Sequence, residues 1–244
     1  MTSQIYKSLW IGSKLSPLEQ LCIKSFVAKG ETYELYCYEE IEGVPEGCTV
    51  KDANHILSKD LIFFYKNNGS PAGYTNWFRY ELLKKTGGTW VDTDVFLLKR
   101  DDKIKPFLMA DQGNGTVNGA ILRIPSNHPL LDACIDECNR AQDNVTWGQT
   151  GPDLITKMMH KFMLMSHLSP TYELYPINHQ NWHWILNPST KSLTEESLKH
   201  ATYLHLWNEM IRRSNYDKTT PPPPGSYLES LYIENNIFNF NYSR

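Results

Sequence analysis

The stretch GGTWVDTDVFLL, residues 87–98, ends one element with a glycine pair and begins another with an apolar run that carries two aspartates. In extended chain, successive side chains point to opposite faces, so Asp92 and Asp94 would share one face while Thr93 lies on the other. The apolar residues on both sides of the pair predict a mostly buried strand. Two like charges would therefore lie close together in the interior.

A divalent cation would relieve this repulsion. Burying a carboxylate without a partner is costly or shifts its protonation. Oxygen ligands suit Mg²⁺ or Mn²⁺, and a site with few protein ligands leaves coordination positions for the phosphate oxygens of a substrate. The alternative is a surface turn with two solvated carboxylates, which is the commoner meaning of a short D-x-D pattern. The apolar flanks of Asp92 and Asp94 favour the metal site.

Length and composition fit an ordinary globular protein. At ~150 residues per domain, 244 residues allow one or two domains. We predict a single domain, 1–244, in which 219–244 form a proline-rich connector and a tail. The chain is 41% hydrophobic and 21% charged, as is typical of soluble proteins. A net charge of -3 gives no electrostatic reason to expect a nucleic acid partner.

Apolar runs and cysteines indicate the compartment. No run approaches ~18 apolar residues, and the first residues lack the apolar core of a signal peptide. Five cysteines without Cys-x-x-Cys spacing fit a reducing environment, so we expect a cytoplasmic protein. Cys134 and Cys138 stand four residues apart in an expected helix, where small core residues are a better interpretation than a metal pair.

Strands and helices alternate along the first part of the chain. Residues 5–10 predict a strand, and Ser16-Pro17-Leu18-Glu19 predicts a helix start with an N-cap, an N1 proline and a capping box. We expect that helix to reach Lys29 and a second strand over 32–38, which implies parallel pairing. A further helix, 75–86, leads directly to the glycine pair.

The pattern predicts an α/β fold with a Rossmann-like, mostly parallel sheet flanked by helices. Ligands of such folds bind beyond the carboxyl ends of the strands. The end of the first strand, at Trp10, and the aspartate pair should therefore face one crevice. Further on we expect helices over 58–66 and 153–167, and extended chain at 172–175 and 202–206.

Three stretches together resemble the glycosyltransferases that carry a DXD sugar-binding region on the GT-A fold. They are SLWIG at 8–12, NWFRYELL at 76–83 continuing through GGTWVDTD at 87–94, and HLWN at 205–208. Similar proteins include the alpha-1,4-galactosyltransferases, the initiating yeast mannosyltransferases, bacterial capsular polysaccharide enzymes and, more remotely, the clostridial glucosylating toxins. The resemblance implies a single GT-A domain.

The resemblance also implies roles for individual residues. Trp10 would stack on the uracil of a UDP-sugar, although a tryptophan that ends a strand is otherwise a core residue. Asp92 and Asp94 would bind Mn²⁺ or Mg²⁺. The two aspartates and Arg79 would act in catalysis, and Arg79 would also reach the donor sugar. The other residues expected on the donor side are Ile11, Asn76, Trp90, Thr93 and Asn118.

The second half of the chain would complete the site. By resemblance, His205 and Asn208 approach the metal or the diphosphate from the opposite wall, and Trp207 packs near the phosphates. A hydrogen-bonded strand histidine is the alternative for His205. Gly151 and Pro152 resemble a Gly-Pro pair that precedes a helix on the acceptor side, and both also fit plain turn chemistry.

One position departs from the family pattern. The family usually has Ser-Asp three and four residues before the arginine, and the aspartate contacts hydroxyls of the donor sugar. Here the pair is Thr75-Asn76. Asn76 can donate and accept hydrogen bonds but carries no charge, so the donor sugar is the least defined part of the prediction.

The expected reaction is transfer of a hexose or N-acetylhexosamine from a nucleotide sugar to a hydroxyl of a glycan or lipid-linked glycan. Capsule, lipopolysaccharide or another surface glycan would be the product, with peripheral contact to the cytoplasmic face of a membrane. The resemblance implies retention of configuration. No carboxylate stands out as a nucleophile, which favours front-face transfer over a double displacement.

Two other functions are alternatives to sugar transfer. A nucleotidyltransferase acting on sugar phosphates would need a glycine-rich, basic loop after the first strand, and IGSK at 11–14 is too sparse. A catalytically silent, sugar-binding GT-A protein would not need to keep Asp92 and Asp94.

Overall fold

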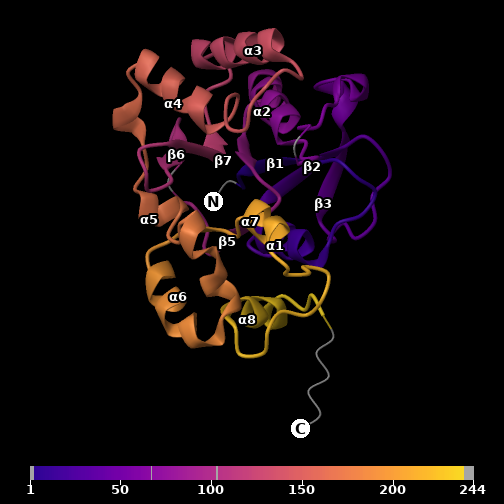
Figure 1. The fold of residues 1–244 in the computed structure, drawn as a ribbon, viewed down its shortest axis with the longest axis vertical. Coiled ribbons are helices and arrows are strands. Elements are labelled where there is room, and N and C mark those ends of the chain that lie inside the picture. The colour runs from indigo at the N-terminus through magenta and orange to yellow at the C-terminus, as the bar shows by residue number, and fades with distance from the viewer. Residues whose placement is uncertain (1–2, 67, 103, 239–244) are drawn as a thin grey trace.

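The computed structural model describes residues 3–66, 68–102 and 104–238. Within them a six-stranded sheet runs in the order β3-β2-β1-β4-β7-β6 (Figure 1). β1 pairs in parallel with β2 and β4, and β2 with β3, whereas β7 is antiparallel to β4 and β6. The α/β fold with a mostly parallel sheet is confirmed. The strands are β1 (Ile5–Trp10), β2 (Thr32–Cys37), β3 (Cys48–Asp52), β4 (Thr89–Val91), β6 (Leu108–Asp111) and β7 (Val117–Arg123).

The first strand-helix-strand unit forms as predicted. Helix α1 (Pro17–Val27) starts with the capping box of Ser16 and Glu19. It ends two residues before the expected Lys29, and the chain turns at Gly30, whose φ of 76° suits glycine. The sequence analysis missed β3, an edge strand with mostly exposed side chains and therefore no burial pattern.

Helices cover both faces of the sheet. Neighbouring strand residues alternate between them, since Trp90 packs on one face and Val91 on the other. On the Trp90 face, α2 packs against α3, and α4 packs against β7; on the other face, α1 packs against β2 (Figure 1). The helices on the Trp90 face are α2 (Ala72–Thr86), α3 (Pro129–Ala141) and α4 (Pro152–Lys161).

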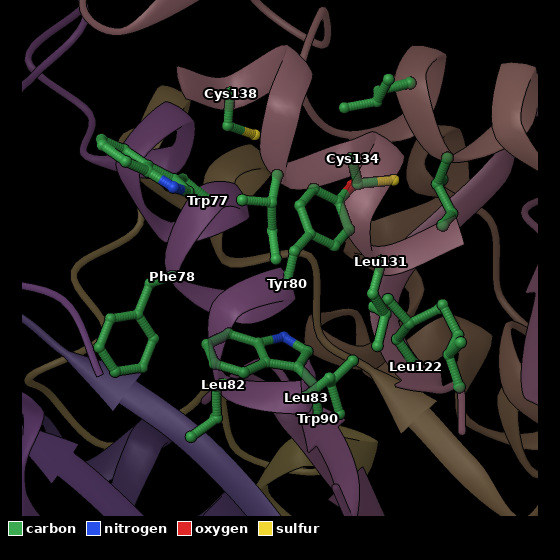
Figure 2. Close-up of a cluster of buried hydrophobic side chains, with 14 of the residues drawn as sticks. Trp77, Phe78, Tyr80, Leu82, Leu83, Trp90, Leu122, Leu131, Cys134 and Cys138 are labelled. Atoms are coloured by element: carbon green, nitrogen blue, oxygen red, sulfur yellow. The ribbon is translucent and has the colours of Figure 1, made fainter. Parts of the chain in front are cut away.

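The core under α2 is aromatic and closely packed (Figure 2). Phe78 and Trp90 lie 6.4 Å apart between ring centroids, and both are buried. Cys134 and Cys138 are buried free thiols in the same cluster, which confirms them as core residues. Burial raises the pKa of Cys138 to about 12, so its thiol stays neutral at physiological pH.

The predicted strand through the aspartates was wrong. β4 ends at Val91, and β5 (Val95–Leu97) belongs to a separate antiparallel pair with β8 (Tyr203–His205). The main-chain N–H of Val95 donates to the carbonyl of Asp92 at 3.0 Å, which makes a turn of the residues between. The chain must change direction there because its two flanks join different sheets. The aspartates therefore lie in a turn, where Asp94 is buried and Asp92 is partly exposed.

Two helix predictions were also wrong in extent. Only Lys59–Leu61 of 58–66 is helical, as a single 3₁₀ turn. Phe63, in the rest of this segment, packs against α2 and fills the space that a side chain at Gly73 would need. The helix expected over 153–167 ends at Lys161, since the chain reverses soon afterwards.

The last part of the chain is mainly short helices. One of them, a helical turn over Thr171–Leu174, takes most of the segment 172–175 that we expected to be extended. Of the predicted tail, residues 239–244 lie outside the described residues, and the single-domain assignment stays a prediction. Among the residues described, no helix is both long and apolar enough to cross a bilayer. The helices are α5 (Thr171–Leu174), η4 (His179–Leu186), α6 (Lys191–Leu198), α7 (Asn208–Arg213) and α8 (Tyr227–Glu234).

The packing of α2 yields a stability prediction. Leu82 is fully buried in the cluster of Figure 2, so Leu82→Ala should lower the free energy of unfolding by ~2 to 5 kcal/mol. Lys84→Ala, on the exposed side of the same helix, removes a surface ion pair with Asp132 and should cost at most ~1 kcal/mol. Urea unfolding of both variants measures the difference. Equal losses would contradict the placement of α2.

Candidate active site

A cavity of ≈ 680 Å³ opens at the carboxyl ends of β1 and β4. Trp10 and Ile11, at the end of β1, line it together with the turn after β4. This agrees with the expectation that ligands bind beyond the carboxyl ends of the strands. Other predicted residues on its wall come from α2, from β4 and the turn after it, from β7 and α4, and from β8 with the start of α7. They are Asn76, Arg79, Trp90, Asp92, Thr93, Asp94, Asn118, Pro152, His205, Trp207 and Asn208.

Arg79 is the centre of the polar network on one wall. Its Nη2 lies 2.9 Å from Asp92 Oδ1, and its Nη1 donates to Asn76 Oδ1 at 2.9 Å. The Trp90 indole N–H also donates to Asp92 Oδ1, at 2.6 Å, and the guanidinium lies 4.9 Å from the Trp90 ring centroid. Arg79 is 4% exposed, so these contacts hold its charge in one place.

Two glycines leave room for this network. A Cβ at Gly119 would lie 2.5 Å from Arg79 Nη1, and one at Gly151 would lie 2.8 Å from Asn76 Nδ2. Gly119 lies within β7 and has no positive φ, so the requirement at that position is steric. Gly151 thus lies behind Asn76, while Pro152 lines the cavity. Sequence analysis missed this role because neither glycine is near Asn76 or Arg79 in the chain.

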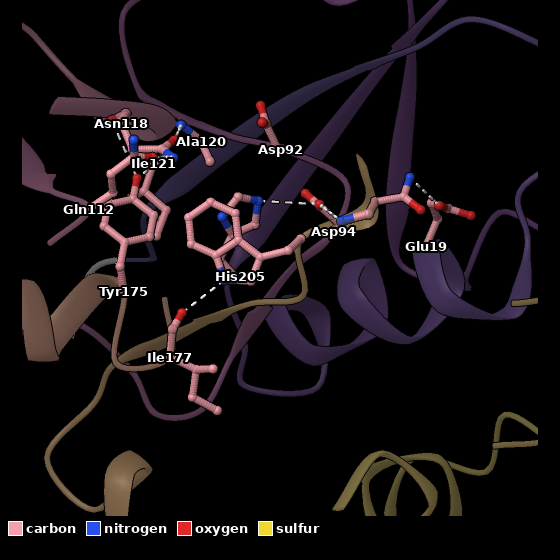
Figure 3. A network of polar contacts seen from close by, with 12 residues as sticks. Glu19, Asp92, Asp94, Gln112, Asn118, Ala120, Ile121, Tyr175, Ile177 and His205 are labelled. Atoms are coloured by element: carbon pink, nitrogen blue, oxygen red, sulfur yellow. Dashed lines mark hydrogen bonds and ion pairs between the residues drawn. The ribbon is translucent and has the colours of Figure 1, made fainter. Parts of the chain in front are cut away.

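Asp94 links the turn to the second half of the chain (Figure 3). Its Oδ2 lies 3.2 Å from His205 Nε2 and accepts the main-chain N–H of Asn208 at 2.7 Å. Burial alone would raise the pKa of Asp94, but His205 and the Asn208 N–H outweigh burial and hold the pKa below its usual value. The carboxylate is therefore charged at neutral pH.

The residues present fit a divalent cation. Asp92, Asp94 and His205 each offer a ligand atom, and these atoms lie within 4.8 Å of one another. His205 Nδ1 is buried without a hydrogen-bond partner among the described residues, and both side-chain hydrogen bonds to Asp92 end on Oδ1. This set of two carboxylates and an imidazole is one that a divalent cation can use.

Trp207 fixes the opposite wall. Its backbone is left-handed, with φ 54°, which is uncommon for a bulky residue and marks a tightly determined turn. Its indole N–H donates to the Ile177 carbonyl at 2.8 Å, and its ring lies 4.1 Å from the His205 ring between centroids. This turn starts α7 and aims the Asn208 N–H at Asp94.

Two further residues come close to the site without having been predicted. Lys218 Nζ contacts the fully buried Glu19, lies 3.1 Å from Asn208 Oδ1 and sits 5.7 Å from the Trp10 ring centroid. Glu19 was visible only as a capping residue. Lys218 lies beside the proline run and gave no signal, because its neighbours here come from distant parts of the chain.

Asn118 occupies the β7 side of the cavity. Its Nδ2 donates to Gln112 Oε1 at 2.7 Å, and its Oδ1 accepts the main-chain N–H of Ala120 at 2.7 Å. The Ala120 carbonyl in turn accepts the main-chain N–H of Asp92 at 2.8 Å. Asn118 thus helps to fix the part of β7 that hydrogen-bonds to the turn of the two aspartates (Figure 3).

Two family models match separate parts of the chain. The glycosyltransferase sugar-binding region containing the DXD motif matches residues 16–108, which include Asp92 and Asp94. The alpha 1,4-glycosyltransferase conserved region matches residues 124–232, which include His205 and Asn208. The two matched regions are the ones that the Asp94 contacts bring together.

Known proteins agree with these matches. The chain is 30% identical over 155 residues to the lactosylceramide 4-alpha-galactosyltransferase of Mus musculus. This alignment covers 58% of this chain and 42% of that protein. It is 25% identical over 179 residues to the alpha-1,4-N-acetylglucosaminyltransferase of Homo sapiens, covering 65% of this chain and 51% of that protein. The chain thus spans about half the length of these relatives.

A solved structure supports the fold. The PaToxG glycosyltransferase superposes with a TM-score of 0.51 at 16% identity, over 81% of this chain and 78% of that one. Fold, family models and relatives point the same way: the chain is similar to glycosyltransferases, and one of its two matched regions is the sugar-binding region that contains the DXD motif.

Proposed function

We propose that the chain is a metal-dependent glycosyltransferase that moves a hexose or N-acetylhexosamine from a UDP-sugar to a glycan hydroxyl. The observation that carries the proposal is the convergence of Asp92, Asp94 and His205 on one cavity that Trp10 and Arg79 also line. An aromatic ring suits a base, the acidic cluster suits a cation with a diphosphate, and the guanidinium suits sugar hydroxyls.

In this proposal each residue acts from its observed position. Asp92, Asp94 and His205 would hold the cation, Mn²⁺ or Mg²⁺. When bound, the cation supplies a Lewis acid that offsets the negative charge developing on the departing diphosphate. Arg79 and Asn76, fixed to each other, would orient the donor sugar through their remaining polar atoms. No reorganisation of these groups would be needed as charge develops.

Retention by front-face transfer agrees with the carboxylates on the cavity wall. A double displacement needs a free carboxylate beside the anomeric carbon. Asp92 is bonded to Arg79 and Asp94 to His205, while Glu209, also on the wall, pairs with Arg212 at 2.8 Å and Arg213 at 2.6 Å. We therefore propose that the departing phosphate helps to deprotonate the acceptor hydroxyl.

The competing readings find less support. A nucleotidyltransferase would need a basic loop after β1, but Lys14 is largely exposed and lies 3.7 Å from Glu42. A silent sugar-binding protein would not need the charged Asp94. The glycan or lipid-linked glycan acceptor, a product in capsule or lipopolysaccharide, the cytoplasmic location and the membrane contact stay predictions.

A nucleotide panel tests the class of the protein. Melting curves with UDP, GDP and their sugars, each with and without Mn²⁺, should show stabilisation by UDP only when the metal is present. At 100 times its dissociation constant a ligand stabilises by ~2.7 kcal/mol, which such curves resolve. Stabilisation by GDP alone, or by no nucleotide, would contradict the proposed donor.

Asp94→Asn should abolish sugar transfer while the protein stays folded. The amide can still accept the Asn208 N–H, but it loses the charge that a cation requires. Activity with UDP-sugars and the melting temperature are the measurements. Asp136→Asn, an exposed position on α3, is the matched control and should leave both unchanged. Near-normal activity of Asp94→Asn would remove the metal assignment.

Trp10→Ala should weaken UDP binding by ~1 to 3 kcal/mol, because the base loses its stacking surface. Calorimetric titration with UDP in the presence of Mn²⁺ measures the loss. Trp184 is similarly half-buried and lies away from the cavity wall, so Trp184→Ala is the control. An unchanged affinity in Trp10→Ala would take this ring out of the donor site.

Gly119→Ala should lower kcat/KM about tenfold, or about 1.4 kcal/mol, because the new Cβ would displace Arg79. A double-mutant cycle with Arg79→Ala supplies the control. If the effect acts through Arg79, Gly119→Ala should change nothing further in the Arg79→Ala background. Additive losses would show that the glycine serves the strand alone.

A further inference from the structure

The cavity extends beyond the proposed donor site to Trp147, a residue to which the proposed mechanism gives no role. Trp147 lies in the loop between α3 and α4, lines the same cavity and is 42% exposed. An indole exposed on a cavity wall presents an apolar face with a polar N–H at its edge, on which a ligand can stack. Its position on a cavity wall suggests such a ligand.

Neighbouring side chains hold the Trp147 ring in place. The Tyr65 ring lies 5.2 Å away between centroids, and the Tyr65 hydroxyl donates to the Thr146 carbonyl at 3.4 Å. The Arg213 guanidinium lies 5.1 Å from the Trp147 ring centroid. A fixed ring can receive a ligand at little cost in side-chain entropy.

The loop that carries Trp147 is anchored to the helix of the donor site. The Tyr80 hydroxyl, on α2, donates to the Thr150 carbonyl at 3.0 Å, and Gly151 packs against Asn76. These contacts hold the loop of Trp147 against the helix that carries Asn76 and Arg79. A ligand stacked on Trp147 would keep a defined position relative to the donor sugar.

Helix α7 makes a second connection between the two parts of the cavity. Asn208, at its first residue, contacts Asp94, and Arg213, at its last, covers Trp147. Five residue steps at 1.5 Å each place their backbones about 7.5 Å apart, on the order of one sugar ring plus its hydroxyls.

Polar groups at this end of α7 suit sugar hydroxyls. Glu209 accepts from Arg212 Nε at 2.9 Å and from Arg213 Nε at 2.6 Å, so both guanidinium groups pair with this carboxylate. Arg213 is half exposed, so leaving the ring face would cost little. Its Nη groups can donate to hydroxyls, and the Glu209 carboxylate can accept from them.

We propose that Trp147, with Arg213 and Glu209, binds the acceptor-side sugar, a neutral hexopyranoside whose apolar face stacks on the indole. The inference rests on the proposed function and assigns its acceptor subsite. The sugar ring replaces the Arg213 guanidinium over Trp147, and the acceptor hydroxyl then faces the donor sugar held by Asn76 and Arg79.

A binding experiment separates this inference from the proposed function. The full chain is labelled with 5-fluorotryptophan, and the Trp10 and Trp147 signals are assigned from Trp10→Phe and Trp147→Phe. Titration with methyl glucopyranoside, galactopyranoside and mannopyranoside should shift the Trp147 signal saturably for at least one of them. UDP with Mg²⁺, which is diamagnetic and does not broaden the signals, should shift the Trp10 signal and leave that of Trp147 in place.

These signals give distinct failures. A Trp147 signal that responds to none of the three glycosides overturns the inference, and so does one that responds to uronosides alone. A Trp10 signal that ignores UDP counts against the proposed donor site and leaves the Trp147 result to be judged by itself.

Turnover supplies the second test. Trp147→Ala should raise KM for the responding glycoside at least tenfold, and this loss should exceed any loss of UDP-sugar hydrolysis by water. Trp147→Phe, which keeps a ring, should retain most of the affinity. Tyr172→Ala, an exposed aromatic position away from this cavity, is the control. Equal loss of hydrolysis and transfer in Trp147→Ala would overturn the assignment.

Discussion

The contacts of the Asp94 carboxylate connect the two halves of the chain, and the site depends on them. The carboxylate lies in the turn between two short strands, and it contacts His205 and the Asn208 N–H from more than a hundred residues away. The Leu206 N–H also donates to the Asp94 carbonyl, at 2.9 Å, so main chain and side chain act together. Burying a carboxylate is costly unless it is paired and hydrogen-bonded, and here both conditions are met by one short segment. The two halves of the chain must be docked before the charge can be buried.

Asp92 also has its charge paired and hydrogen-bonded, but by partners from the first half of the chain. Its partners are Arg79 and Trp90, which belong to the first half of the chain and to the core under α2. One aspartate is thus tied to the sheet and the other to the second half, although they are two residues apart. Breaking the strand at Thr93 makes this division geometrically feasible, because each flank follows its own sheet. The pair is held close by two independent frameworks, and a cation between them would unite both.

Local sequence predicted the elements whose signals are local. The capping box of Ser16 and Glu19 started α1 correctly, and the spacing of Asn76 and Arg79 on a helix agrees with their 2.9 Å hydrogen bond. The strand through Asp92 and Asp94 was wrong because alternation describes one sheet, whereas these residues stand between two. The steric need for Gly119 and the approach of Lys218 to Trp10 had no local signal, since each arises from a contact between distant segments.

The same dependence on distant contacts explains why the cavity has its particular length. α2 supplies Asn76 and Arg79 and anchors the loop of Trp147, while α7 runs from Asp94 to that same ring. Two helices from different halves of the chain therefore connect the metal-ligand cluster to the far end of the cavity. A change in the docking of the halves would move His205 and Asn208 relative to Asp92 and α2. The spacing between the proposed donor and acceptor subsites is thus a property of the docked fold, and no single loop determines it.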